Sequence, residues 1–205
     1  MSKPENLHHR LLELQKLLFD FTQIDRQIFF PDDNRQDRLE NDAEHSYSLA
    51  MAVWFLSQHF PHLDRDKMIR YALIHDFVEV HAGDMQAIGR TEEQQKLKQK
   101  REDEALKKLE SEWPDFSELT TSITTYEALN DPEANFVYAL DKLMPMLLNL
   151  LSEGKTWKKY DFKRSVVIKQ KDDKVLVSKE VNELWQAYRQ MILDAKGHFN
   201  EDTKA

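Results

Sequence analysis

The chain has 205 residues, of which 40 % are hydrophobic and 32 % charged, which suits one globular domain with a sizeable core and argues against wholesale disorder. Cysteine is absent, which excludes disulfide scaffolds, thiol catalysis and thiolate zinc sites, and the net charge of −8 argues against a nucleic-acid partner. No apolar run approaches the roughly 18–20 residues of a membrane-spanning helix, and the first residues form no apolar signal segment, so we expect a cytoplasmic protein without a membrane partner.

In the first half of the chain, apolar residues recur at steps of three and four, the period of an amphipathic α-helix. They predict a first helix over residues 7–28, a second over 45–60 and a third over 68–79 that ends near Gly83. A polar stretch at 31–40 separates the first two. A highly charged segment at 91–110 predicts a long solvated helix, which Thr91 and Gln94 can open as a capping box.

The second half continues with the same period. A short helix is predicted over residues 116–129, and Asp131 with Pro132 is typical of the cap and first turn of an apolar helix that runs to residue 151. Residues 152–164 are predicted to form a loop rich in aromatic side chains, and a last helix covers about 174–195. No strand alternation of useful length occurs. The sequence therefore predicts an all-α fold, a single-domain helical bundle of six or seven helices over residues 1–205.

Four polar residues occupy positions where the helical period places core-facing side chains: His45, His75, Asp76 and Asp141. A carboxylate buried without a partner is so costly that it neutralises, pairs or binds a metal. A single histidine on such a stripe is most often an ordinary core residue, and one His-Asp pair occurs easily by chance. Four such positions on three helices favour a divalent-cation site, and mixed imidazole and carboxylate ligands suit first-row transition metals.

Two further carboxylates lie near these positions. Glu79 follows His75 by four residues and Asp76 by three, so the helical period brings it to the same side. Asp84 follows the predicted stop at Gly83, where a short loop can return it to the site. A carboxylate beside a metal can orient or deprotonate a water, although each of the two, taken alone, is equally well explained as an ordinary helix or turn residue.

Four sequence blocks together resemble the HD-domain metal-dependent phosphohydrolases, in particular the branch with the bacterial 5'-deoxynucleotidases. The blocks are Glu40-Asn41-Asp42-Ala43-Glu44-His45-Ser46, His75-Asp76-Phe77-Val78-Glu79, Gly83-Asp84 and Asp141-Lys142, and the resemblance covers about residues 10–160. It implies a helical bundle of the HD-domain type, a homodimer, and a cobalt, manganese or other divalent ion, with magnesium and zinc as further options. It also implies that His45, His75, Asp76 and Asp141 bind this ion and that Glu79 and Asp84 activate a water.

The resemblance is incomplete upstream of the first histidine. The nucleotidases carry an Arg-Trp pair there for phosphate and sugar recognition, whereas here Arg26 matches the arginine and Gln27 replaces the tryptophan. Arg38, which precedes the motif block, is a second candidate for binding the substrate phosphate, since a guanidinium can contact a phosphate with two hydrogen bonds. Either arginine, taken alone, could equally form a surface salt bridge.

These patterns favour a phosphomonoesterase that acts on a small phosphorylated substrate, most simply a nucleoside or deoxynucleoside 5'-monophosphate. One alternative is an HD-type diphosphate or cyclic-nucleotide hydrolase. Another is a regulatory module that binds a nucleotide without turnover, which would have no need of Glu79. A purely structural bundle leaves the four polar residues on apolar stripes unexplained.

Overall fold

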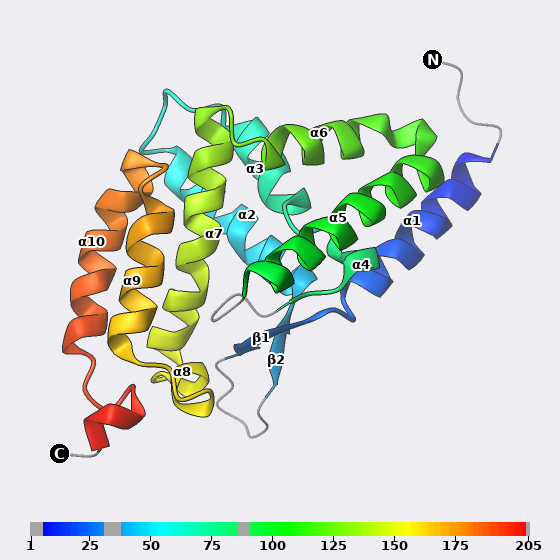
Figure 1. Ribbon diagram of the computed structural model, residues 1–205. Helices are drawn as coiled ribbons and strands as arrows, with labels where there is room; N and C mark the ends of the chain where they lie inside the picture. Colours follow the sequence, from blue (N-terminus) through cyan, green and yellow to red (C-terminus); the bar gives the residue numbers. More distant parts are fainter. Residues whose placement is uncertain (1–5, 31–37, 86–90, 204–205) are drawn as a thin grey trace.

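The computed structural model describes the chain at residues 6–30, 38–85 and 91–203. Helices make up most of it, as the all-α prediction requires (Figure 1). The α-helices are α1 (Leu7–Phe21), α2 (Asp42–Ser57), α3 (Arg65–Ile74), α4 (Glu79–Ala82), α5 (Glu92–Glu112), α6 (Ser117–Glu127), α7 (Pro132–Leu151), α8 (Lys155–Lys159), α9 (Arg164–Val175) and α10 (Lys179–Asp194). Two short 3₁₀ helices cover Pro114–Phe116 and Asn200–Thr203.

The predictions of a first helix through residue 28 and of no strands were wrong. Helix α1 ends at Phe21, and the chain continues into strand β1 (Asp25–Phe29), which pairs antiparallel with β2 (Leu39–Asn41). Backbone hydrogen bonds extend this pairing at both ends, from Phe30 N to Arg38 O (2.8 Å) and from Asp42 N to Ile24 O (3.0 Å). The spacing of Ile24 and Ile28 matches a helical period, but the partner strand decides the conformation.

The predicted third helix is interrupted at His75 and Asp76. Helix α3 ends at Ile74, residues 75–78 form a turn, and α4 starts at Glu79. Backbone bonds between residues three apart hold this turn, including Glu79 N to Asp76 O at 2.8 Å. Gly83 ends α4 with a φ of 72°, as the predicted stop requires.

The C-terminal region contains more helix than the sequence predicts. The predicted aromatic loop includes α8, and α9 was missed because charged residues dominate it, although Val167, Ile168 and Val175 are buried. The last helix starts at Lys179 rather than near residue 174. The expected helix caps are present: Thr91 and Gln94 form a capping box, and Asp131 accepts a hydrogen bond from Ala134 N at 2.9 Å.

Helix α7 runs through the centre of the molecule, between the α9–α10 pair and the helices α2, α3 and α6 (Figure 1). Its buried apolar face, including Phe136, Val137, Leu140 and Leu143, belongs to the hydrophobic core. Because α7 is covered on several sides, its polar residue Asp141 is placed in the interior. Within the described part of the chain, no helix has both the length and the apolar character of a membrane span.

Candidate metal centre

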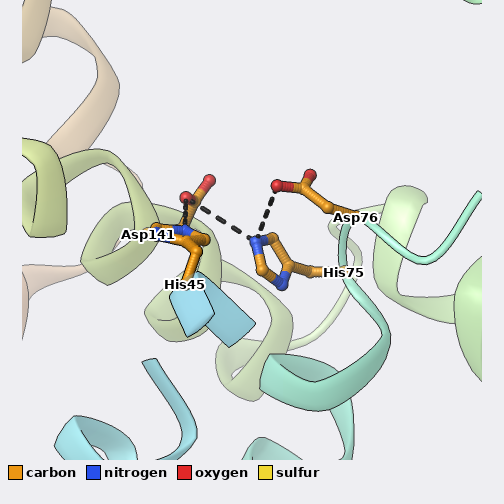
Figure 2. A group of neighbouring side chains, drawn as sticks. All are labelled: His45, His75, Asp76 and Asp141. Atoms are coloured by element: carbon orange, nitrogen blue, oxygen red, sulfur yellow. Dashed lines mark hydrogen bonds and ion pairs between the residues drawn. The ribbon is translucent and has the colours of Figure 1, made fainter. Parts of the chain in front are cut away.

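The fold brings together the four residues predicted to bind a metal. His45 comes from α2, His75 and Asp76 from the turn after α3, and Asp141 from α7 (Figure 2). One nitrogen or oxygen from each residue lies within 4.8 Å of the others. His45, His75 and Asp141 are buried and Asp76 is half-buried, so the cluster lies inside the protein with one side partly open.

The Asp141 carboxylate lies between the two imidazoles. Its Oδ1 is 2.9 Å from Nε2 of His45 and 3.7 Å from Nε2 of His75, and Asp76 Oδ2 is 3.0 Å from the same His75 nitrogen (Figure 2). Burial raises the pKa of Asp141, but Lys142 and the two histidines outweigh it and hold that pKa well below its usual range. Asp141 is therefore ionised at neutral pH.

The tautomer of His75 follows from its backbone partner. Nδ1 lies 2.9 Å from the Ala72 carbonyl oxygen, which only accepts hydrogen bonds, so Nδ1 carries the hydrogen. Nε2 then presents a lone pair toward the Asp76 and Asp141 carboxylates, is buried, and has no hydrogen-bond partner among the described residues. A nitrogen lone pair this close to carboxylate oxygens is repelled by them unless a cation lies between. The four side chains therefore fit a metal ion as its nitrogen and oxygen ligands.

His45 has a second buried carboxylate behind it. Glu40 Oε2 lies 3.4 Å from His45 Nδ1 and 3.6 Å from Arg26 Nε, and the Glu40 side chain is almost completely buried. A carboxylate at the distal nitrogen orients a metal-binding imidazole and strengthens its basicity. Glu40 belongs to the motif block, but its position in the sequence did not reveal this contact.

Glu79 lies at the start of α4 and is only 3 % exposed. Its Oε1 accepts a hydrogen bond from Lys98 Nζ on α5 at 3.0 Å, while Oε2 has no partner among the described residues. Burial and the nearby Asp76 raise the pKa of Glu79 to about 9, against the opposing charge of Lys98. Asp42 is also close, since Asp42, Asp76 and Glu79 each offer an oxygen within 4.8 Å of the others.

Asp84 directly follows Gly83 and is half-buried. Its charge contributes to the raised pKa of both Asp42 and Glu79, so it faces the same group of carboxylates. The structure therefore brings both predicted catalytic carboxylates to the neighbourhood of the predicted ligands. Asp42, fully buried at the start of α2, was not predicted as a site residue.

The two predicted phosphate-binding arginines have different surroundings. Arg26 points from β1 into the site, where Nη1 donates to Asp76 Oδ2 at 2.5 Å and to Asp42 Oδ1 at 3.0 Å. Arg38 is largely exposed, donates to Glu44 Oε2 at 2.7 Å and lies over the Phe30 ring. The structure thus brings Arg26, but not Arg38, into contact with a predicted metal ligand.

Two lysines that the sequence analysis did not select lie on the same side of the centre. Lys142 Nζ is 2.5 Å from Asp141 Oδ2, and Lys98 bonds Glu79 as described above. Both line an open cavity together with His75, Asp76 and Asp141. Lys142 follows Asp141 directly in the sequence, whereas Lys98 lies in a charged run that gave no signal of its role.

Comparisons with known proteins agree with this arrangement. A model of the HD domain family matches residues 26–185. The 5'-deoxynucleotidase HDDC2 of Bos taurus is 34 % identical over 105 residues, which are 50 % of this chain and 49 % of that protein, so the match spans about half the length of this curated relative.

Two solved structures share the fold. One is from Magnetospirillum magnetotacticum MS-1 and is described as a predicted metal-dependent phosphohydrolase; it is 28 % identical with a TM-score of 0.77, over 96 % of this chain and 99 % of that one. A conserved hypothetical protein from Pyrococcus furiosus has a TM-score of 0.59 at 20 % identity, over 87 % of this chain and 99 % of that one, which supports the fold alone. Because the family model matches well over half of its residues, the chain belongs to the HD domain family.

Proposed function

We propose that this protein is a metal-dependent phosphomonoesterase that hydrolyses nucleoside or deoxynucleoside 5'-monophosphates. The observation that carries the proposal is the buried His75 Nε2, which has no hydrogen-bond partner among the described residues and faces Asp76 and Asp141. The named activity of the Bos taurus relative and the description of the Magnetospirillum structure support the same reaction class.

His45, His75, Asp76 and Asp141 are the proposed ligands of the ion. A divalent ion held there would act as a Lewis acid on a phosphoryl oxygen and lower the pKa of a water. The donor set of two imidazoles and two carboxylates suits first-row transition metals, and among these we favour cobalt or manganese because the resemblance to the HD-domain phosphohydrolases implies them. Zinc and magnesium are the competitors in a metal-replacement experiment.

Glu79 is the proposed proton acceptor for the attacking water. Its Oε2 has no hydrogen-bond partner among the described residues. Without a metal, burial and Asp76 favour the protonated form of Glu79; a bound cation would lower this pKa, and the ionised carboxylate would then take a proton from the water and return it to the leaving alcohol. In the hydrolysis, a water oxygen bonds to phosphorus, the bond from phosphorus to the 5' oxygen breaks, and that oxygen takes up a proton. Asp84 is proposed to orient the water from the other side.

Arg26 is the proposed phosphate ligand, because its guanidinium contacts Asp76 and also lines the neighbouring cavity. Lys142 can add a second positive charge, since it lies between Asp141 and the open cavity above the cluster. Arg38 is a weaker candidate, because its guanidinium pairs with Glu44. Its role would require a substrate that extends toward the start of α2.

We also propose that the protein is a homodimer. Four large apolar side chains follow each other along one side of α2 at helical spacing and are 44–66 % exposed: Tyr47, Met51, Trp54 and Phe55. A continuous apolar surface of this kind is typical of a protein interface. A second copy of this chain is the simplest partner that covers it.

The test of the proposed activity is phosphate release by protein that has been stripped with a chelator and reloaded with one metal at a time. The substrates are ribo- and deoxynucleoside 5'-monophosphates, 3'-monophosphates, diphosphates, cyclic nucleotides and sugar phosphates. We expect release from the 5'-monophosphates, lost with chelator and in His75→Ala, and retained in the control His9→Ala, an exposed histidine on α1.

Other outcomes would assign a different function. Turnover of only diphosphates or cyclic nucleotides would replace the phosphomonoesterase by another HD-type hydrolase. Metal-loaded protein that binds nucleotides but releases no phosphate from any substrate would support a regulatory module.

A further inference from the structure

A second cavity adjoins the candidate metal centre on the side of Arg26 and Asp84. The space inside it is about 620 Å³ when its opening to solvent is included. Arg26 lines this cavity and also contacts Asp76, so only one side chain separates the cavity from a proposed metal ligand. A substrate with its phosphate at the metal centre can therefore extend its organic group into this cavity.

The walls of this cavity suit a flat, largely apolar group. Trp157 lines it and stacks on Phe199 at 4.6 Å, which fixes the indole plane. Tyr160 and Phe162 line it as well, with ring centroids 5.8 Å apart and ring planes inclined by 30°. These three residues come from the segment 152–164, which the sequence analysis singled out for its aromatic side chains. Aromatic walls of this kind favour an aromatic ligand.

One charged residue on the cavity wall is unusual. Lys171 of α9 is only 5 % exposed, and its side-chain amine forms no hydrogen bond or ion pair with another residue of the described part of the chain. The charges that act on it come mostly from other cations, namely Lys142, Lys174 and Arg26, and the carboxylate of Asp141 only partly offsets them. Burial and these cations lower the pKa of Lys171 to about 7.

A purely structural lysine would extend its amine to water or pair it with a carboxylate, since a buried amine without a partner is costly. Lys171 has no carboxylate partner among the described residues, and it lines the cavity, so its amine is available to a ligand there. An acceptor that enters the cavity with a ligand would supply a hydrogen-bond partner for this amine.

We propose that this cavity binds the nucleobase of the substrate, and that Lys171 donates a hydrogen bond to a carbonyl oxygen or ring nitrogen of that base. Lys171 is then a specificity-determining residue that does not contact the reacting phosphate. The inference rests on the proposed function and names the part of the substrate that the enzyme selects.

The experiment compares substrates that differ only by the base. Metal-loaded protein is assayed with nucleoside 5'-monophosphates and with ribose 5-phosphate and deoxyribose 5-phosphate, which lack a base, and the ratio of kcat/KM values measures base recognition. In Lys171→Met this ratio should fall about 10- to 100-fold, the usual effect of losing a hydrogen bond to a charged group. Lys169→Met removes an exposed lysine from the same helix and should keep the ratio of the unmodified protein.

Two further measurements keep the inference separate from the proposed function and from folding. Lys171→Gln retains a shorter donor and should recover part of the ratio, while a melting curve checks that each variant is folded. Equilibrium binding of the product nucleosides, which carry no phosphate, should weaken about tenfold in Lys171→Met even in protein without turnover.

The outcomes are distinct. An unchanged ratio and unchanged nucleoside binding in folded Lys171→Met would overturn the assignment of Lys171 while the phosphomonoesterase stands. A loss confined to nucleotides with a second phosphate would also overturn it, because Lys171 would then bind an anion rather than a base. Absence of phosphate release from every ester would defeat the proposed function, and nucleoside binding would still decide the role of the cavity.

Discussion

Replacement of Lys171 by methionine should make the protein more stable, and the gain should depend on pH. A lysine has a pKa of 10.5 when exposed, and burial together with Lys142, Lys174 and Arg26 lowers the pKa of Lys171 to about 7. Between these two values the unfolded chain binds more protons at this position than the folded one, so the contribution to the free energy of unfolding rises with pH. At about 1.4 kcal/mol per pKa unit, the full change is on the order of 5 kcal/mol.

The direction of this pKa shift determines the pH range in which Lys171 destabilises the folded protein. Near pH 7 and below, the folded protein carries the whole cost of the buried amine, and near pH 10.5 it carries almost none. The difference in the free energy of unfolding between Lys171→Met and the unmodified protein should therefore be largest at pH 7 and shrink toward pH 10. Urea denaturation of the metal-free proteins at pH 7, 8.5 and 10 measures it, with Lys169→Met as the control. A difference that stays constant with pH, or a variant that is less stable at pH 7, would refute the reasoning.

Three further predictions concern the metal centre and the apolar side of α2. Chelation should lower the melting temperature, and cobalt or manganese should restore it, because an ion in hundred- to thousandfold excess over its Kd stabilises the folded state by about 3–4 kcal/mol. Equal melting temperatures with and without metal would contradict the proposed metal site. The variant His75→Ala should lose both bound metal and activity. The variant Glu79→Gln should retain its metal, as measured by elemental analysis, while its kcat falls about 100- to 10,000-fold. Loss of metal from Glu79→Gln would instead identify Glu79 as a metal ligand. Trp54→Glu should convert a dimer into a monomer in light scattering, while Lys100→Glu, an exposed change on α5, should not.

The sequence alone was sufficient to predict those features of the fold that depend on residues a few positions apart, such as the ends of helices. Thr91 with Gln94, Asp131 with Pro132, and Gly83 each mark a helix end through contacts within a few residues, and all three are present. The strand pair could not be predicted in this way. Ile24 and Ile28 fit a helical step, and only the partner strand, which follows after the segment at 31–37, changes their conformation.

The same distinction applies to the candidate site. His45, His75, Asp76 and Asp141 stood out because a polar residue on an apolar stripe is visible in the sequence alone. Glu40, Asp42 and Lys98 did not, since a glutamate before a helix, an aspartate in its first turn and a lysine in a charged run are ordinary where they stand. Their roles depend on which elements pack together, and the contact between Lys98 and Glu79 joins α5 to α4.

The charges around the metal centre explain why a cation belongs to it. Five buried or half-buried carboxylates meet there, from Glu40, Asp42, Asp76, Glu79 and Asp141. Only three cationic side chains form ion pairs with these five carboxylates among the described residues. Arg26 pairs with Glu40, Asp42 and Asp76, Lys98 pairs with Glu79, and Lys142 pairs with Asp141. The pKa of Asp42 is raised to about 6 and that of Glu79 to about 9, because these cations offset the carboxylate charges only in part; at pH 7 protons therefore remain on Glu79 and, to a smaller extent, on Asp42. A divalent ion would supply the remaining charge and displace those protons, so binding of metal should release protons in a weakly buffered solution near neutral pH. With metal bound, Glu79 would then be ionised, which is the form in which it can accept a proton from the attacking water.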